Sequence, residues 1–161
     1  MTVKEYNKSV EAYSDHIYRF ILKNIKNENT AQDIVQDSFE KLWINRKAVY
    51  FTKVKAYLFT TAYRTMIDII RKQKRISLTE DQSIFESHEE NSFNDIQEIL
   101  HEAIEKLPEI QRSVILLRDY EGYSYKEIAD ITNLNESQVK VYIYRARVYL
   151  KNYIGKIENL V

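Results

Sequence analysis

Apolar side chains in the first half of the chain recur every three or four residues, the spacing of one face of an α-helix. The first stripe consists of Tyr6, Val10, Tyr13, Ile17 and Ile21. After a polar break, a second helix is predicted at about 31–46 and a third at about 56–72. The apolar positions of these two helices are Val35, Phe39, Leu42 and Trp43, then Leu58, Ala62, Met66, Ile69 and Ile70. Three amphipathic helices predict a small helical bundle.

The helical pattern is interrupted in the middle of the chain. Residues 78–94 lack periodicity and are rich in Ser, Glu, Asp and Asn, which predicts a solvated linker. Periodicity returns over 96–107, and another helix is predicted at about 109–120. Pro108 suits the start of that helix, and Gly122 is expected to end it.

The last third of the chain has the pattern of a helix-turn-helix. Ser124 and Glu127 have the spacing of a capping box, so a short helix is predicted to follow. Asn133 suits the left-handed conformation that the turn requires, and Asn135 suits the N-cap of a helix at about 136–153. Two such helices, the second one basic, indicate a helix-turn-helix, with a plain helical hairpin as the alternative.

Composition supports an all-helical chain. The 161 residues include two glycines and one proline, too few for sheets joined by tight turns. No cysteine is present, which excludes disulfides and thiolate metal sites. No signal-peptide core and no apolar run near the roughly 20 residues that span a bilayer are found, so we expect a cytoplasmic protein without membrane insertion.

The charges are separated along the chain, although the formal net charge is zero. Residues 55–75 contain six basic side chains and one acidic one, and residues 137–157 contain five basic side chains and no acidic one. Residues 76–105 between them contain nine acidic side chains and no basic one. Two basic segments around an acidic spacer indicate two nucleic-acid surfaces, with ordinary surface charge as the alternative.

The second helix of a helix-turn-helix enters the major groove, where its first turns meet base edges. There Gln pairs with adenine, Lys and Arg pair with guanine, and Val contacts the thymine methyl group. Arg147 and Lys151 lie further along the helix and suit phosphate contacts. For Tyr142 and Tyr144, packing against a neighbouring element is the alternative role. The candidate DNA-binding residues are Gln138, Lys140, Val141, Tyr142, Tyr144, Arg145 and Arg147.

Several segments resemble regions of the sigma-70 family of RNA polymerase subunits. Residues 31–43 resemble region 2.2, and residues 56–75 resemble regions 2.3 and 2.4. Residues 107–118 resemble the start of region 4, and residues 121–147 resemble its helix-turn-helix. The resemblance covers nearly the whole chain in family order. It points to the extracytoplasmic-function (ECF) group, which has regions 2 and 4 only.

The resemblance implies a sigma factor that binds core RNA polymerase and directs promoter recognition and transcription initiation. Region 2.2 implies contact with the clamp helices of the largest polymerase subunit, and the flap is a second expected polymerase contact. The polymerase-binding candidates are Asp33, Gln36 and Asp37. A regulating anti-sigma factor is an implied partner, whereas catalytic residues, cofactors and metals are not implied.

The resemblance also implies that regions 2.3 and 2.4 melt and hold the −10 element. Single-stranded DNA requires aromatic faces for stacking and basic side chains for the backbone. A base taken out of the duplex would need a pocket, which we expect between 49–55 and 57–64. For Phe51, packing in the core is the alternative role. The −10 candidates are Tyr50, Phe51, Lys55, Arg64, Arg71, Lys72, Lys74 and Arg75.

Four positions differ from the usual family pattern. Arg64 stands where the family usually has Asn, and Tyr63 stands where it has a basic residue. Tyr142 replaces an Arg, and Asn133 replaces the Gly of the turn. Because Arg64 and Tyr142 lie in DNA-reading regions, the family pattern does not fix the promoter sequence of this chain.

Three other functions are alternatives to that of a sigma factor. A stand-alone helix-turn-helix regulator would leave the region 2.2 pattern unexplained. An enzyme is disfavoured, since His101-Glu102 lacks the second His of a zinc protease motif: position 105 is Glu. An anti-sigma-like helical module would bind protein but not DNA, which charge reversal of Lys140 and Arg145 would reveal.

The expected architecture is all-α, with two small helical domains joined by a flexible acidic linker. Residues 1–75 form the expected region 2 domain, which binds polymerase and the −10 element. Residues 76–95 form the linker, and residues 96–161 form the region 4 domain, which binds the −35 element.

Overall fold

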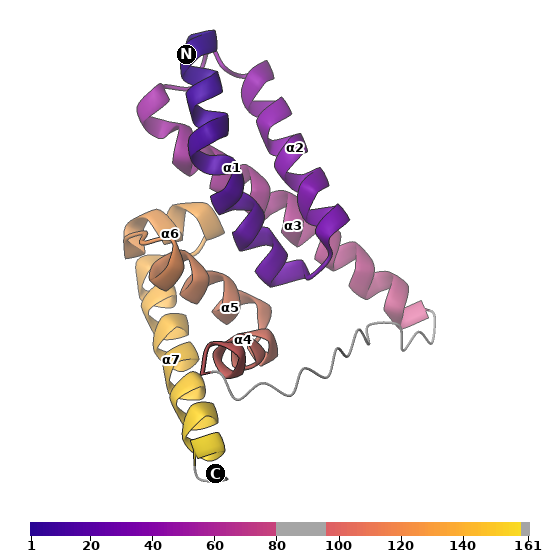
Figure 1. Ribbon diagram of the computed structural model, residues 1–161, viewed down its shortest axis with the longest axis vertical. Coiled ribbons are helices and arrows are strands. Elements are labelled where there is room, and N and C mark those ends of the chain that lie inside the picture. The colour runs from indigo at the N-terminus through magenta and orange to yellow at the C-terminus, as the bar shows by residue number, and fades with distance from the viewer. Residues whose placement is uncertain (80–95, 159–161) are drawn as a thin grey trace.

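The computed structural model describes residues 1–79 and 96–158, and within these ranges every long element is a helix (Figure 1). The expected all-α class is therefore confirmed. Most of the expected linker, residues 80–95, lies outside the described residues. The helices are α1 (Val3–Ile25), α2 (Glu28–Ile44), α3 (Val54–Thr79), α4 (Ile96–Lys106), α5 (Glu109–Ile115), α6 (Tyr125–Thr132) and α7 (Glu136–Glu158).

The first three helices form the bundle that the apolar stripes predict. A capping box of Thr2 and Glu5 begins α1, and Lys26 ends it in the left-handed conformation with φ 61°. Asn27 then caps α2 by accepting a hydrogen bond from the Thr30 amide at 3.0 Å, so α1 and α2 form a tight hairpin. The centre of the bundle is filled by Ile17, Phe20, Ile21, Ala31, Ile34, Leu42, Leu58, Phe59, Ala62 and Met66.

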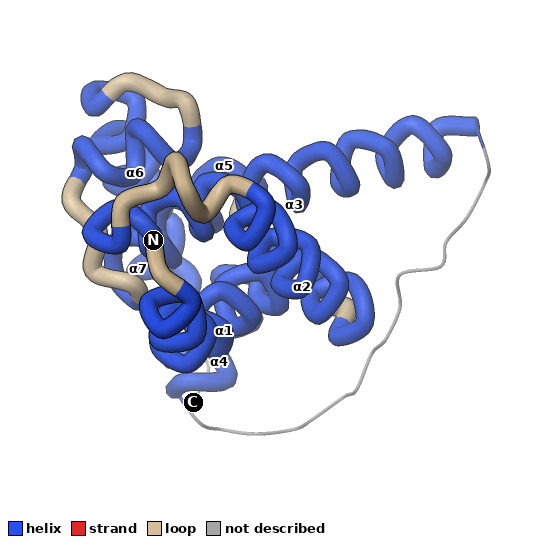
Figure 2. Tube along the Cα trace, turned by 90° about the horizontal axis from the view of Figure 1, so that it is seen from above, coloured by secondary structure: helices blue, strands red, loops and turns tan. Residues whose placement is uncertain are grey.

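The third helix is longer than predicted. It continues to Thr79, beyond the expected end near Lys72, and its last turns project away from the bundle (Figure 2). All side chains over 71–77 are exposed. The apolar stripe ends at Ile70, but no Gly or Pro follows, and Lys, Arg and Gln are good helix formers. Helix propensity therefore extends the helix past the point where burial ends.

The single helix predicted at 109–120 is two elements. After α5 the chain widens into a π-helical turn, Leu116–Tyr120, in which the Glu121 amide donates to the Leu116 carbonyl at 3.1 Å. The Tyr123 amide donates to the Leu117 carbonyl at 3.0 Å, and Gly122 between them has φ 74°. Such wide turns shift the direction of the side chains that follow. After this turn, Glu121 pairs with Arg19 of α1 and Tyr123 meets the Phe59 ring of α3, so both side chains point toward the N-terminal half.

The helix-turn-helix is capped as the sequence predicts. The Ser124 hydroxyl accepts from the Glu127 amide, and the Glu127 carboxylate accepts from the Ser124 amide, both at 3.1 Å. Asn133 takes the left-handed conformation with φ 59°. Asn135 and Gln138 then form a reciprocal pair at the start of α7. These local hydrogen bonds set the angle between α6 and α7.

Replacing the cap of α6 is expected to destabilise the helix-turn-helix. Ser124→Ala removes the acceptor of the Glu127 amide, and loss of an N-cap costs about 0.5–2 kcal/mol. We expect urea denaturation to show a free energy of unfolding lower by that amount. Ser137→Ala is the matched control, because Ser137 is an exposed serine in the first turn of α7. Equal stability of the two variants would contradict the role of the cap.

Candidate DNA and polymerase interfaces

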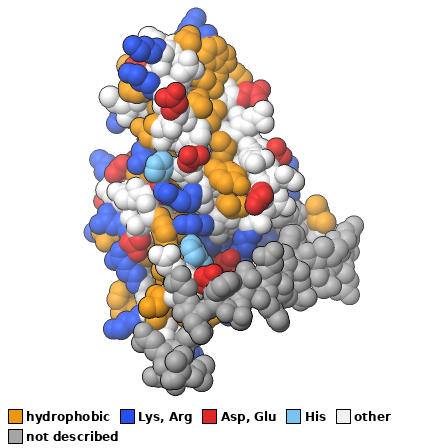
Figure 3. All heavy atoms as spheres, in the orientation of Figure 1, with side chains coloured by type: hydrophobic (Ala, Val, Ile, Leu, Met, Phe, Trp, Pro, Cys, Tyr) orange, Lys and Arg blue, Asp and Glu red, His pale blue; other side chains and the backbone are white. Residues whose placement is uncertain are grey.

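The outer face of α7 is the first candidate DNA surface. Val139, Ile143 and Ala146 are buried, so the positions between them point outward, except half-buried Tyr142. Tyr144 is 69% exposed and Val141 is 45% exposed. The remaining exposed candidates on this helix are Gln138, Lys140, Arg145 and Arg147. Basic side chains gather along the edge of the molecule formed by α6 and α7 (Figure 3).

Two candidates on α7 have structural roles of their own. The Gln138 side-chain oxygen accepts from the Asn135 amide at 3.0 Å, while Asn135 accepts from the Gln138 amide at 2.8 Å. Bidentate pairing with adenine uses both the oxygen and the NH2 group of a glutamine side chain. Because the Gln138 oxygen caps the helix, only its side-chain NH2 group is free to contact a base. Tyr142 is half-buried and packs against the core, which supports the packing alternative for that tyrosine.

A group of cations surrounds Tyr125 at the start of α6. The Arg118 guanidinium lies 4.5 Å from the centre of the Tyr125 ring, and the Lys140 ammonium lies 5.6 Å from it. Arg147 donates to Asp119 at 2.8 Å, and this hydrogen bond raises the pKa of Arg147. Sequence reasoning did not select Arg118 or Tyr125 for the site, since they come from other elements than α7. The spacing of residues along α7 therefore could not identify them as part of the site.

The second candidate DNA surface lies where the chain enters α3. Tyr50 is 78% exposed and Phe51 is 40% exposed, beside the short 3-10 turn Phe51–Lys53. Arg64 is exposed further along α3, as are the cations of its projecting end, Arg71, Lys72, Lys74 and Arg75. The exposure of Phe51 favours a binding role over the core-packing alternative. These side chains offer the aromatic faces and positive charges that single-stranded DNA requires.

Two side chains in the first half of α3 are covered. The Lys55 ammonium lies 4.6 Å from the centre of the Tyr123 ring, and Lys55 is half-buried. Tyr63 is 6% exposed, and burial raises the pKa of its hydroxyl to about 12. The tyrosine that replaces the usual basic residue of the family is thus a core residue here. It extends the apolar core rather than the basic surface.

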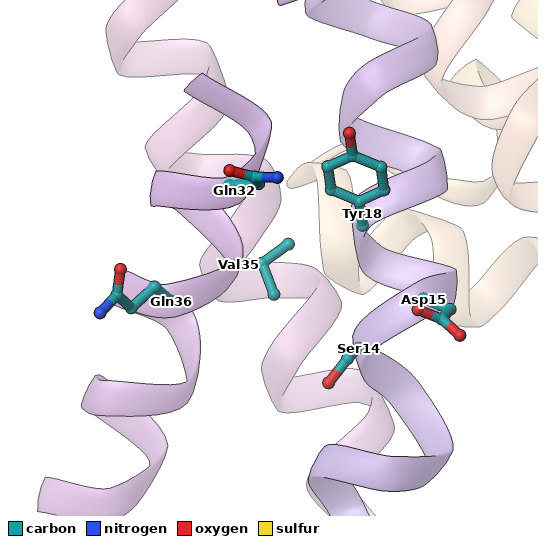
Figure 4. A pocket seen from close by; sticks show the side chains of 6 residues that line it. All are labelled: Ser14, Asp15, Tyr18, Gln32, Val35 and Gln36. Atoms are coloured by element: carbon teal, nitrogen blue, oxygen red, sulfur yellow. The ribbon is translucent and has the colours of Figure 1, made fainter. Parts of the chain in front are cut away.

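The candidate polymerase face is the exposed side of α2. Asp33 and Gln36 are exposed, and Asp37 pairs with Lys41 one turn later at 2.9 Å. Beside this face, α1 and α2 enclose an open groove of about 450 Å³ (Figure 4). Tyr18 and Val35 form its apolar part, and the polar side chains around them are Ser14, Asp15, Gln32 and Gln36. An acidic and amide-rich face of this kind suits a basic partner surface.

Within residues 1–79 and 96–158, no group of three or more His, Cys, Asp or Glu side chains is placed to hold a metal ion. In the same residues, no helix has the length and apolar character needed to cross a membrane.

Comparison with known proteins connects both surfaces to one family. A sigma-70 region 2 model matches residues 9–76, and a sigma-70 region 4 model matches residues 97–150. RNA polymerase sigma factor SigV of Bacillus subtilis (strain 168) is 35% identical over 143 residues, 85% of this chain and 85% of that protein. ECF RNA polymerase sigma factor SigM of the same organism is 30% identical over 146 residues, 88% of this chain and 90% of that protein.

A solved structure has the same fold. It is the sigma factor RpoE in its co-crystal with the anti-sigma factor NepR from Bartonella quintana, with a TM-score of 0.81 and 24% sequence identity. The match covers 95% of this chain and 98% of that one. The two region models account for more than half of the chain, and they match in the order that the sequence motifs predict. The chain therefore belongs to the ECF group of the sigma-70 family and is a sigma factor, a subunit that directs RNA polymerase to promoter DNA.

Proposed function

We propose that the two halves of the chain divide promoter recognition between them. Residues 1–75 bind core polymerase and the −10 element, and residues 96–161 bind the −35 element. The observation that carries this division is the presence of two separate exposed surfaces, one on α7 and one around the start of α3. Each surface has the side chains that its form of DNA requires, and each lies in the matching family region.

The proposed −35 contacts lie on the outer face of α7. Lys140 and Arg145 offer donors to guanine, and Val141 and Tyr144 offer apolar contact to thymine methyl groups. Gln138 contributes one amide group, because its oxygen caps the helix. Arg147 is the proposed phosphate contact, and its hydrogen bond to Asp119 orients the side chain.

The proposed −10 contacts combine stacking with charge. Tyr50 and Phe51, just before α3, offer exposed rings to unpaired bases. Arg64 lies on α3 itself. The projecting end of α3 supplies the remaining cations for the DNA backbone, namely Arg71, Lys72, Lys74 and Arg75. Lys55 joins this set once Tyr123 no longer covers it. The expected base pocket between 49–55 and 57–64 is part of the same proposal.

The proposed protein partners are core polymerase and an anti-sigma factor. Asp33, Gln36 and Asp37 offer acceptors to basic side chains of the clamp helices, and the flap is the proposed contact of region 4. Two solved structures with similar folds are complexes, one of the sigma factor RpoE with the anti-sigma factor NepR and the other of CnrH with the cytosolic domain of CnrY. By likeness to the RpoE complex, an anti-sigma factor is the proposed regulator of this chain. The proposed role is recognition rather than catalysis, carried out in the cytoplasm where RNA polymerase works.

Photo-crosslinking tests the proposed division directly. A benzophenone amino acid replaces Tyr50 in one variant and Tyr144 in another, and each is assembled with core polymerase and promoter DNA. We expect the first to crosslink to the −10 element and the second to the −35 element. The control carries the same group at Glu11, an exposed residue of α1, and should give no DNA product. Crosslinks from both variants to one element would overturn the division.

A further inference from the structure

Exposed large apolar side chains gather where α2 ends. Trp43 is 37% exposed and Ile44 is 69% exposed, and exposed Tyr50 and Phe51 follow directly after the loop 45–49. Apolar and basic side chains lie side by side at this end of the molecule (Figure 3). Single exposed apolar residues are ordinary, whereas a concentration of them marks a binding surface. Trp43 and Ile44 have no part in the contacts proposed above.

The ring of Trp43 carries an arginine. The Arg46 guanidinium carbon lies 4.0 Å from the centre of the Trp43 ring, and Arg46 Nη1 donates to the Trp43 carbonyl at 2.8 Å. The Tyr6 ring meets the indole edge-on, with the ring centres 4.9 Å apart. These contacts hold the guanidinium in place, so a ligand does not have to order a mobile side chain. We call Trp43 and Arg46 the platform.

The cations around the platform have no acidic partners within residues 1–79 and 96–158. Arg46 forms no ion pair there, and its Nε and Nη2 atoms make no hydrogen bond to these residues. The exposed side chains of Lys47 and Lys53 form no ion pair with them either. Along the chain, residues 41–67 contain six Lys or Arg and no Asp or Glu. Such a stretch attracts a polyanion.

The loop presents these cations rather than bare carbonyl groups. The last carbonyls of a helix carry partial negative charge, which repels phosphate. Here Arg46 covers the Trp43 carbonyl, and the Asn45 side chain donates to the Lys41 carbonyl at 3.0 Å. The same Asn45 side chain donates to the Tyr57 hydroxyl at 3.1 Å, which ties the loop to α3. The end of α2 is therefore capped and fixed in position.

The platform lies within reach of a strand bound at the proposed −10 surface. Four residues along the chain separate Arg46 from Tyr50, and a segment of that length spans at most about 14 Å. Four stacked nucleotides at about 3.4 Å each span a similar distance. A single strand that stacks on Tyr50 therefore reaches the platform within about four nucleotides.

We infer that the platform binds one further base of the single strand that Tyr50 and Phe51 hold. The base stacks on the Arg46 guanidinium over the Trp43 ring, and Lys47 contacts a neighbouring phosphate. Guanidinium planes and aromatic rings are stacking surfaces that accept any base. The inference rests on the proposed function, because the exposed rings of Tyr50 and Phe51 define the path of the strand.

Two variants separate stacking from charge in the full-length chain. The probe is a fluorescein-labelled oligothymidylate of about 20 nucleotides, titrated at several salt concentrations. Lysine has the charge of arginine but not its plane, so Arg46→Lys should bind about fivefold to tenfold more weakly with an unchanged salt dependence. Lys47→Gln should lower the slope of log affinity against log salt by about 0.7, because one phosphate contact is lost.

The matched control is Lys156→Gln, which makes the same charge change at an exposed position near the end of α7. This position lies at the opposite end of the molecule from the start of α1 (Figure 1). The control should leave both the affinity and the salt slope at their parental values. Parental values in Arg46→Lys and Lys47→Gln as well would overturn the inference. Lys47 makes no structural contact of its own, so its variant keeps the test independent of folding.

The fluorescence of Trp43 locates the bound strand. The chain contains one tryptophan, so its emission reports on the platform alone. Acrylamide quenches an exposed indole by collision, and a base stacked over the platform shields the ring. We expect saturating oligothymidylate to lower the quenching constant of the parent about twofold. Unchanged quenching in the presence of bound oligonucleotide would place the strand elsewhere and overturn the inference.

Tyr50→Ala distinguishes failure of the platform from failure of the proposed function. Weaker binding by Tyr50→Ala alone would overturn the platform and support the −10 surface. Weaker binding by the Arg46 and Lys47 variants alone would support the platform and remove Tyr50 from the −10 surface. If these two variants lost core polymerase binding but kept the oligonucleotide, the platform would be a protein contact and the inference would fail. A parent that bound no oligonucleotide would contradict both.

Discussion

The double variant Lys140→Glu/Arg145→Glu is expected to lose promoter recognition while it keeps core polymerase binding. Both side chains lie on the exposed face of α7, on the side opposite to buried Val139 and Ile143. A good side-chain contact with a base contributes about 1–3 kcal/mol of discrimination, and about 1.4 kcal/mol corresponds to a tenfold change. Two lost contacts, replaced by repulsion from phosphate, should lower −35-dependent transcription about 100-fold or more.

In vitro transcription with a fixed core concentration measures this loss. The control is Lys4→Glu/Lys8→Glu, which makes the same charge change on the exposed side of α1. The control should retain near-parental transcription, and both variants should bind core equally. A helical module that binds protein but not DNA would show no difference between them. Parental transcription by Lys140→Glu/Arg145→Glu would therefore contradict the −35 assignment.

The second large effect is expected on α2. Asp33→Lys/Asp37→Lys places positive charges on the face proposed to meet basic clamp helices, and it removes the ion pair of Asp37 with Lys41. Removing one partner of a close interfacial charge pair costs about 2–5 kcal/mol when the pair is desolvated, and rim charges cost less. We expect core binding to weaken at least about thirtyfold.

Competition with a labelled parental chain measures this affinity. The variant Glu11→Lys/Glu102→Lys changes the net charge equally at exposed positions on α1 and α4, so it serves as the control. The two variants should differ in core binding but bind a −35 duplex alike. Unchanged core binding in Asp33→Lys/Asp37→Lys would mean that polymerase docks elsewhere on region 2.

Local features of this fold could be predicted because short-range physical rules determine them. The capping box of Ser124 and Glu127, the left-handed Asn133 and the cap at Asn135 each depend on residues within a few positions. The outward positions of α7 follow from the spacing of its buried residues. Helix ends were less predictable. Helix α3 continues to Thr79, because the residues that follow its apolar stripe have high helix propensity.

Features that depend on distant segments could not be predicted. No local pattern marks the π-helical turn at Leu116–Tyr120, which sets the direction of Glu121. Tyr63 is buried in an apolar cluster that includes side chains from both halves of the chain, which a local pattern does not indicate. The DNA-contact role of Gln138 was incomplete for a local reason, since the side chain that suits adenine also accepts from the Asn135 amide at the start of its own helix. For Glu121 and Tyr63, contacts with distant parts of the chain decide the position of the side chain.

Initiation from a promoter library by core RNA polymerase, with and without this protein, tests the central claim most directly. We predict specific transcripts that appear only when the protein is present, and their start sites will define the −35 and −10 sequences together. Core polymerase with the Lys140→Glu/Arg145→Glu variant should not produce them. A protein that neither binds core nor changes the transcripts would contradict the assignment of this chain as a sigma factor.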